Sequence, residues 1–292
     1  MTTSSSMSPT ATGIASADKL LTVHNLDVAY PGRGFRAAAF KALKGVSIDV
    51  GAGETVGLVG ESGSGKTTLG RAVLGLAPVT AGSIRYRGRE IAHLSRRQRR
   101  GLSGEIQVVF QDPYNSLNPS MQIADILCEP LRAHGASRID ARRRVAELLD
   151  RVNLPRDAGR RLPREFSGGQ RQRIAIARAL ALQPALIVCD EPVSALDLST
   201  QARILDLFIE IQQATKVAYL FVSHDLEVVR YISHRVAVML HGEIVEYGDG
   251  ETITSNPKHP YTKKLLMSAP IPDPGGQAKR RHERALLLGA AS

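Results

Sequence analysis

The fold of this chain is decided by one short stretch, Gly60-Glu61-Ser62-Gly63-Ser64-Gly65-Lys66-Thr67-Thr68. The stretch fits the pattern G-x-x-x-x-G-K-[ST], follows an apolar run at residues 55–59 and precedes a helical pattern over residues 67–76. A strand, a glycine-rich turn and a helix in this order form a phosphate-binding loop, because glycine lets the backbone turn its N–H groups toward a polyphosphate. We therefore predict that the whole stretch binds the phosphates of a ligand.

The end of the stretch supplies the charged and metal-binding groups that a glycine turn lacks. Lys66 brings a full positive charge to the outer phosphates, and the N-terminus of the following helix adds a partial positive charge. The hydroxyl of Thr67 is placed to ligate Mg²⁺. Together these groups predict a site for a nucleotide and its magnesium ion.

A second candidate part of the site follows the apolar run at residues 186–189, where Asp190 and Glu191 stand side by side. Adjacent strand residues point to opposite faces, and open α/β sheets bind ligands at the carboxyl ends of their strands. We predict that Asp190 holds Mg²⁺, directly or through water, and that Glu191 polarises an attacking water. Two acids after a strand are a weak signal alone and a strong signal beside a phosphate loop.

Strand and helix patterns alternate along most of the chain, which predicts an α/β fold with a parallel sheet. With the phosphate loop, this order predicts a P-loop NTPase: a RecA-like parallel-sheet core, an antiparallel β region and an inserted α-helical subdomain. Further strands are expected at residues 20–30, 47–50, 84–86, 106–110, 186–189 and 218–222, with a hairpin at residues 236–240 and 243–246. Helices are expected at residues 139–152, 170–182, 200–214 and 226–232.

The composition divides the chain into three parts. Residues 1–19 are rich in Ser, Thr and Ala and are expected to form a disordered lead, without the features of a secretory signal. Residues 20–254 form the expected nucleotide-binding domain, with the helical insert at residues 112–182 as a separate lobe. Residues 255–292 are Pro-rich and basic and are expected to be an appended tail. We expect no membrane span, because no segment approaches ~18 consecutive apolar residues.

The charge and the cysteines limit the classes of function. The formal net charge is +10, from 38 Lys and Arg against 28 Asp and Glu. This balance fits solvated faces as well as attraction to phosphates, nucleic acid or a membrane surface. Cys128 and Cys189 do not form a CxxC pair, which argues against a zinc site or a cysteine-held iron–sulfur cluster. Cys189 lies in an apolar run and is expected to be a buried structural thiol.

The segment Phe166-Ser167-Gly168-Gly169-Gln170, followed by Arg171-Gln172-Arg173, resembles the signature of the nucleotide-binding subunits of ABC transporters. Physically it is a second glycine-bearing helix start, in which Ser167 is expected to cap the helix and the free N–H groups to take an anion. The resemblance implies that this segment meets the γ-phosphate of ATP bound to the opposite subunit, so that two subunits work as a pair. The family usually has Leu in place of Phe166, a change expected to affect packing rather than phosphate contact.

Further positions match the family in the expected order. The resemblance implies that Gln111 contacts Mg²⁺ and the attacking water and senses the membrane partner. It implies that His224 touches the γ-phosphate, that residues 194–197 line the dimer seam, and that Tyr30 stacks on adenine. A polar residue after a strand and an aromatic residue in a turn are also ordinary structural features. This alternative matters most for Tyr30, whose implied role rests on position alone.

The resemblance narrows to the peptide and nickel importer branch of the family. It rests on Gln111-Asp112-Pro113 with Ser116-Leu117-Asn118-Pro119, and on the tail Asn256-Pro257-Lys258-His259-Pro260-Tyr261-Thr262-Lys263 with Pro270-Ile271-Pro272-Asp273-Pro274. Within this branch the chain is most similar to the second ATPase subunit of dipeptide and oligopeptide permeases. Some subunits of such systems carry a cysteine cluster near the C-terminus, which is not expected here because no cysteine follows Cys189.

The resemblance implies an ATPase that couples ATP hydrolysis to the uptake of peptides, with nickel, glycosides and opines left open as cargo. The implied partners are a second ATPase subunit, two membrane-spanning permease subunits and, indirectly, an extracytoplasmic solute-binding protein. A heterodimer of two different ATPase subunits is favoured, and a homodimer stays open. The implied location is the cytoplasmic face of the cell membrane, as a peripheral protein.

Two other classes of ATPase share the head domain of this family. The ATPases of DNA repair or chromosome maintenance have a long coiled coil, for which the interval between Gln111 and Ser167 leaves no room. The translation-associated ATPases carry two cassettes in one chain, whereas this sequence has one phosphate loop and one signature segment. We therefore expect no nucleic-acid partner.

Overall fold

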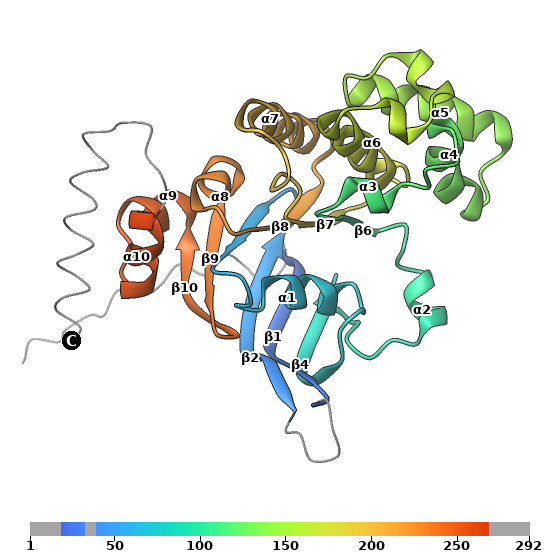
Figure 1. The fold of residues 1–292 in the computed structure, drawn as a ribbon. Coiled ribbons are helices and arrows are strands. Elements are labelled where there is room, and N and C mark those ends of the chain that lie inside the picture. The colour runs from blue at the N-terminus through green and yellow to red at the C-terminus, as the bar shows by residue number, and fades with distance from the viewer. Residues whose placement is uncertain (1–18, 33–38, 269–292) are drawn as a thin grey trace, which may run out of the picture.

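The computed structural model describes residues 19–32 and 39–268, which form two β-sheets surrounded by helices (Figure 1). The strands of the larger sheet are β3 (Thr55–Val59), β6 (Ile106–Val109), β7 (Leu186–Asp190), β8 (Ala218–Ser223), β9 (Arg235–Leu240) and β10 (Glu243–Asp249). They lie in the order β10-β9-β3-β8-β7-β6, parallel from β9 to β6, with β10 antiparallel to β9. Strands β3 and β8 are buried along their whole length, which explains their continuous apolar runs.

The smaller sheet is antiparallel and consists, in spatial order, of β2 (Phe40–Gly51), β1 (Lys19–Tyr30), β4 (Val79–Tyr86) and β5 (Arg89–Glu90). Strand β2 begins at Phe40, well before the expected residues 47–50. The sequence did not indicate this earlier part, because an irregularity near Gly45 interrupts the alternation of the strand. Gly45 has a φ of 63°, and its N–H donates to Asp27 Oδ1 at 2.6 Å, where the register between β1 and β2 shifts. A shifted register hides the period of two on which a strand prediction depends.

Helices cover both faces of the larger sheet. On one face, Leu186 and Val188 of β7 belong to a core shared with α1 (Lys66–Val73) and the smaller sheet. On the other face, Ile187 and Cys189 belong to a core shared with α6 (Gly168–Leu180) and α7 (Leu198–Thr215). The alternation along β7 therefore places α1 and α6 on opposite faces of the sheet.

The helices between β6 and β7 gather at one side of the molecule (Figure 1). They are α3 (Pro113–Ser116), α4 (Ile123–Ala133), α5 (Arg138–Arg151), the 3₁₀ turns η1 (Arg156–Arg160) and η2 (Pro163–Glu165), and α6. Their apolar side chains, such as Leu127 and Leu148, share one continuous core with Phe208 of α7 and Tyr219 of β8. The composition suggests a separate lobe, but this helical region is joined to the sheet through a common core.

The last described helices lie at the β9–β10 end of the larger sheet: α8 (Leu226–Ile232), α9 (Gly250–Ser255) and α10 (Pro260–Ser268). Side chains of α10 pack against an apolar cluster that includes Val59 of β3, Val238 of β9 and Ile253 of α9. The described part of the expected tail is thus a helix docked on the sheet. Residues 269–292 of that tail and residues 1–18 of the expected disordered lead lie outside the described residues, and Lys19 belongs to β1.

The mostly parallel sheet, the antiparallel β region and the inserted helices confirm the predicted fold class. A short exposed helix, α2 (Arg96–Arg100), stands between β5 and β6. Within residues 19–32 and 39–268, none of the helices has the length and apolar character of a transmembrane span. Because β9 to β6 are parallel, the segments that follow β3, β6, β7 and β8 all leave the sheet at its carboxyl edge.

Candidate nucleotide-binding site

The phosphate loop, residues 60–68, leads from the end of β3 into α1 at the carboxyl edge of the parallel strands. Its conformation requires glycine at Gly65, which has a φ of 108° and directly precedes α1. A Cβ atom at this position would lie 2.9 Å from the carbonyl oxygen of Ala42 on β2. The loop therefore packs closely against the smaller sheet, and no side chain fits between them.

Lys66 is buried inside the loop, with 4% of its surface exposed. Its Nζ atom donates to the carbonyl oxygens of Gly60 at 2.7 Å and Glu61 at 2.8 Å. Burial lowers the pKa of Lys66, and the nearby carboxylates of Glu191 and Asp190 oppose this shift. The loop carbonyls thus hold the ammonium group next to the N-terminus of α1, whose first N–H groups favour an anion.

Thr67 and Asp190 meet although they are far apart in the sequence. The Thr67 hydroxyl donates to Asp190 Oδ1 at 2.9 Å, which joins the start of α1 to the end of β7. Burial raises the pKa of Asp190, and the hydrogen bond from Thr67 opposes this shift. A hydroxyl and a single carboxylate are oxygen ligands of the kind that Mg²⁺ takes when substrate phosphates complete its shell. The residues at this position therefore fit a magnesium ion.

The predicted catalytic residues converge on one carboxylate oxygen. Glu191 Oε2 lies 3.3 Å from Gln111 Nε2 and 3.2 Å from His224 Nδ1. Gln111 follows β6, Glu191 follows β7 and His224 follows β8, and these three strands are neighbours in the sheet. The side chain of Glu191 is 16% exposed and that of His224 is 51% exposed, so solvent reaches the group.

The backbone of Glu191 adopts a conformation that no local sequence pattern indicates. Its φ of 48° lies in the left-handed region, which residues other than glycine rarely adopt. Its N–H donates to the carbonyl oxygen of Val222 on β8 at 3.0 Å, and Ser194 Oγ donates to its carbonyl oxygen at 3.1 Å. These bonds hold the turn after β7 in the conformation that brings the carboxylate to Gln111 and His224.

The signature segment forms a second helix start. Ser167 caps α6, because its Oγ accepts the N–H of Gln170 at 3.4 Å while the Gln170 side chain accepts the N–H of Ser167 at 3.0 Å. Ser167, Gly168 and Gln170 are exposed, whereas Phe166 is buried in the core of the helical region. The structure does not bring this segment to the phosphate loop of the same chain, because α6 and α1 lie on opposite faces of the larger sheet.

Tyr30 and residues 195–197 lie outside the group formed by Gln111, Glu191 and His224, which Ser194 contacts through the Glu191 carbonyl. Tyr30 ends β1 opposite Phe40 of β2, and its half-buried side chain packs against the core that α1 shares with the smaller sheet. Asp197 caps α7 by accepting the N–H of Thr200 at 3.0 Å, and its hydrogen bonds with Ser199 and Thr200 lower its pKa. The adenine-stacking role of Tyr30 and the dimer-seam role of residues 194–197 stay predictions.

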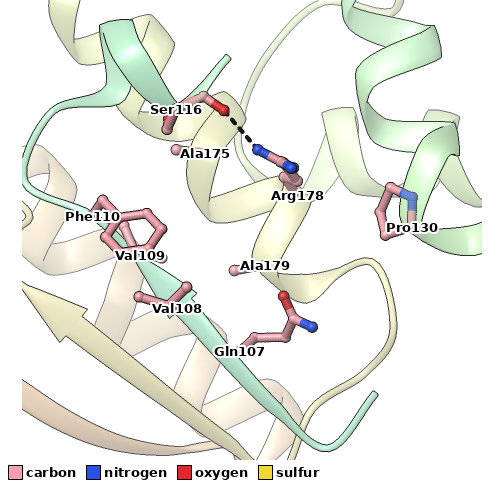
Figure 2. A pocket seen from close by; sticks show the side chains of 9 residues that line it. All are labelled: Gln107, Val108, Val109, Phe110, Ser116, Pro130, Ala175, Arg178 and Ala179. Atoms are coloured by element: carbon pink, nitrogen blue, oxygen red, sulfur yellow. Dashed lines mark hydrogen bonds between the residues drawn. The ribbon is translucent and has the colours of Figure 1, made fainter. Parts of the chain in front are cut away.

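A cavity of about 140 Å³ lies between β6 and the helical region, beside the segment that leads to Gln111 (Figure 2). Residues 107–110, Pro130 of α4 and one face of α6 line it. Arg178 of α6 donates to the carbonyl oxygen of Ser116 at 2.6 Å at one side of the cavity (Figure 2). Open space thus borders the Gln111 segment on the side of the helices.

Comparison with known proteins shows which families the chain resembles. Residues 43–194 match the family described as "ABC transporter", and residues 245–288 match "Oligopeptide/dipeptide transporter, C-terminal region". The chain is 52% identical over 234 residues to the oligopeptide transport ATP-binding protein OppD of Mycobacterium tuberculosis, with 80% of this chain and 38% of that protein covered. It is 48% identical over 266 residues to the dipeptide transport ATP-binding protein DppF of Lactococcus lactis subsp. cremoris, with 90% of this chain and 85% of that protein covered.

A solved structure is similar as well. It is the dimeric post-hydrolysis state of the ATP-binding cassette MJ0796 bound to ADP and Pi, with a TM-score of 0.70 and 30% sequence identity. The match covers 78% of this chain and 98% of that one. The chain spans only 38% of the length of the OppD relative. On the family match, on the DppF relative and on the phosphate loop between β3 and α1, the chain belongs to the ABC transporter family.

Proposed function

We propose that the chain is the ATP-hydrolysing subunit of an ABC import system that takes up peptides or a related small solute. The observation that carries this proposal is the meeting of Gln111, Glu191 and His224 at one carboxylate oxygen, beside the buried Lys66. The arrangement has the parts that phosphoryl transfer to water needs: a phosphate cradle, oxygen ligands for a cation and a base for the attacking water.

In this proposal, residues 60–68 bind the phosphates of ATP. The N–H groups at the start of α1 and the ammonium group of Lys66 supply positive charge around the outer phosphates. Thr67, Asp190 and Gln111 would hold Mg²⁺, whose charge would offset the negative charge of the phosphates. Tyr30 offers an aromatic face to adenine, a contact worth about 1–3 kcal/mol in base stacking elsewhere.

Glu191 acts as the general base in this proposal. It accepts a proton from the attacking water at Oε2, the oxygen that Gln111 and His224 contact. These contacts orient the carboxylate toward the position of the attacking water, and in this proposal His224 contacts the γ-phosphate. A positioned general base contributes roughly 10²–10⁴-fold in rate, so Glu191 is the residue whose loss should cost most turnover.

A second subunit completes the proposed site. The Ser167 segment cannot serve the phosphate loop of its own chain, since α6 and α1 lie on opposite faces of the sheet. We infer that residues 167–170 of this chain contact the γ-phosphate held by a partner, and that the partner's signature segment covers the ATP held here. The dimeric state of the similar MJ0796 cassette supports this pairing. We favour a different ATPase subunit as the partner, with a homodimer as the alternative.

The proposed transport partners are two membrane-spanning permease subunits and, indirectly, an extracytoplasmic solute-binding protein, with the chain bound at the cytoplasmic face of the cell membrane. In this proposal, movement at Gln111 passes into the helical region that borders the cavity of Figure 2, where Arg178 of α6 holds the carbonyl of Ser116 in α3, the first helix after Gln111. The names of the relatives, oligopeptide and dipeptide transport proteins, favour peptides over nickel, glycosides or opines as cargo.

The substitution Glu191→Gln tests this proposal, because it removes the base and keeps the size of the side chain. Mg²⁺-dependent ATP hydrolysis by the purified full chain is measured over a range of protein concentrations, with ATP binding measured in parallel. We expect turnover to fall by at least about 100-fold while ATP affinity stays within about twofold of wild type. The matched control is Glu210→Gln on the exposed face of α7, which removes the same charge and should leave both quantities unchanged.

The possible results separate the parts of the proposal. Turnover of the Glu191→Gln variant above about a tenth of the wild-type rate contradicts the assignment of the base. A wild-type rate that rises faster than linearly with protein concentration shows that the chain pairs with itself. ATP binding without turnover at any concentration shows that a different ATPase subunit or the permease subunits are required. A wild-type chain that does not bind ATP contradicts the proposed function as a whole.

A further inference from the structure

The last described helix, α10, touches the phosphate loop. The hydroxyl oxygen of Tyr261, in α10, accepts the N–H of Glu61 at 2.9 Å, although 200 positions separate the two residues. Tyr261 lies in the part of the chain that matches the oligopeptide and dipeptide transporter C-terminal region, and Glu61 lies in the part that matches the ABC transporter family. The contact therefore joins the branch-specific part of the chain to the proposed ATP site, where the mechanism above gives Tyr261 no role.

The contact acts on a single peptide group. The N–H of Glu61 and the carbonyl of Gly60 belong to one planar trans unit and point in opposite directions. Lys66 Nζ donates to this carbonyl oxygen at 2.7 Å, while Tyr261 accepts the N–H at the other end. One end of a rigid plane is thus held by the lysine of the phosphate site and the other by α10. A rotation of this plane breaks both hydrogen bonds together.

Tyr261 is itself held in place from several sides. Its ring packs against the apolar cluster that contains Val59, the last residue of β3 before the loop. Its N–H donates to His259 Nδ1 at 3.2 Å, and the N–H groups of Lys258 and His259 donate to the Glu246 carboxylate on β10 at 2.7 and 3.2 Å. Burial raises the pKa of Tyr261, so its hydroxyl stays protonated at neutral pH and accepts as a neutral oxygen.

We propose that Tyr261 is a positioning residue of the nucleotide site, which holds the Gly60–Glu61 peptide in the orientation that keeps Lys66 ready for phosphates. This inference rests on the function proposed above, because it requires the loop to bind ATP. Without the hydroxyl, bound ATP must order this peptide itself, and part of the binding free energy is lost. We expect the loss of one neutral hydrogen bond to weaken MgATP binding by about 2- to 10-fold.

The test compares two tyrosine substitutions in the full chain. Tyr261→Phe removes the hydroxyl and keeps the ring in the apolar cluster. The matched control is Tyr247→Phe on β10, because the Tyr247 hydroxyl donates to the carbonyl oxygen of Asp49 at 3.0 Å, away from the loop. Calorimetric titration with MgATP gives both the Kd and the number of binding sites. We expect Tyr261→Phe to raise the Kd by about 2- to 10-fold at an unchanged number of sites, and Tyr247→Phe to leave the Kd unchanged.

A purely structural role of Tyr261 gives a different result, because a partly unfolded sample loses sites instead of affinity. A wild-type Kd in the Tyr261→Phe variant, or fewer sites at an unchanged Kd, overturns the inference. An equal rise of the Kd in the Tyr247→Phe variant overturns it too. If the wild-type chain does not bind MgATP, the proposed function is contradicted, and this inference with it. If the wild-type chain binds MgATP and Tyr261→Phe binds it equally well, only this inference is contradicted.

Discussion

Two segments of this chain start a helix with small residues, and they differ in how they are embedded. The phosphate loop is enclosed in its C-terminal part, because Gly65 has a φ of 108° against β2 and Lys66 is 4% exposed. The signature segment before α6 is open, because Ser167 has an ordinary φ of −66° and stands exposed with Gly168. One segment is built into its own chain and the other is exposed, which is the arrangement expected if two chains share the proposed site.

The two helix starts also differ in what satisfies their first N–H groups. Gly65 makes no side-chain hydrogen bond to α1, which leaves the start of this helix to a ligand. Ser167 and Gln170 form a capping box, which stabilises α6 without any ligand. Substitutions in the enclosed segment should therefore affect folding and ATP binding together, whereas those in the open segment should affect chiefly the paired, working state.

The largest difference in stability between the two segments is expected for the substitutions Gly65→Ala and Gly168→Ala. At Gly65 a methyl group meets the Ala42 carbonyl oxygen at 2.9 Å in a backbone conformation that alanine disfavours, whereas at Gly168 it meets Leu196 Cδ2 at an ordinary 3.5 Å. We expect Gly65→Ala to lower the free energy of unfolding by about 2–5 kcal/mol and Gly168→Ala to change it by less than about 0.5 kcal/mol. Denaturant unfolding of the nucleotide-free chain measures both. An equal loss of unfolding free energy in both variants would contradict the difference that we describe between the two segments.

At the phosphate site, Asp190→Asn should change stability and MgATP binding in opposite directions. Burial raises the pKa of Asp190, so the folded state disfavours its ionised form, and ionisation at neutral pH lowers stability. We expect the Asp190→Asn variant, without nucleotide, to melt at a higher temperature than wild type at neutral pH and to bind MgATP more weakly. The gain in melting temperature should shrink as the pH falls through the raised pKa, where the wild-type carboxyl group takes up a proton.

The control substitution, Asp150→Asn, should change the melting temperature in the opposite direction. A hydrogen bond from Arg156 lowers the pKa of Asp150 on the exposed side of α5, so its ionised form favours folding and this contribution is lost as the pH falls. Asp150→Asn should therefore lower the melting temperature at neutral pH and leave MgATP binding unchanged. An Asp190→Asn variant that melts below wild type at neutral pH would contradict the proposed cost of burying this carboxylate.

The smallest difference in stability between a variant and its matched control is expected for Ser167→Ala, in the open signature segment. Loss of a serine N-cap costs about 1 kcal/mol, and the matched control Ser137→Ala, at the N-cap of α5, should cost a similar amount. Both variants should bind MgATP as wild type does. In the assembled transporter only Ser167→Ala should reduce turnover, because we propose a contact with a partner's phosphate for Ser167 and none for Ser137. A similar loss of turnover with Ser137→Ala would show that the effect comes from weakened helices.

The order of the motifs was enough to name three residues that the structure brings together, but not how they meet. Gln111, Glu191 and His224 each follow an apolar run, and parallel strands end at one edge of a sheet. Their convergence depends on the neighbouring positions of β6, β7 and β8 and on the φ of 48° at Glu191. That conformation is held by a hydrogen bond to Val222 from another strand, which no local pattern contains.

Five of the described helices were not expected from the sequence, namely α2, α3, α4, α9 and α10, and in α4 and α10 a proline affects the prediction. Helix α4 contains Pro130, which lacks the N–H that would bond to the carbonyl of Ile126 four residues earlier, and proline at such a position argues against a helix. Helix α10 begins at Pro260, and proline at the first helical position is a favourable start that the sequence could have indicated. The bond between Tyr261 and Glu61 had no signal at all, because it depends on where α10 docks on the sheet.

The most direct test of the division between the two segments is the affinity of the purified full chain for MgATP in Lys66→Ala and Gly168→Arg variants. Lys66→Ala removes the buried charge of the enclosed segment, and Gly168→Arg places a bulky group on the open one. We predict that Lys66→Ala weakens MgATP binding by at least about 10-fold, whereas Gly168→Arg leaves it within about twofold of wild type. The same loss of affinity in both variants, or wild-type affinity in Lys66→Ala, would contradict the account.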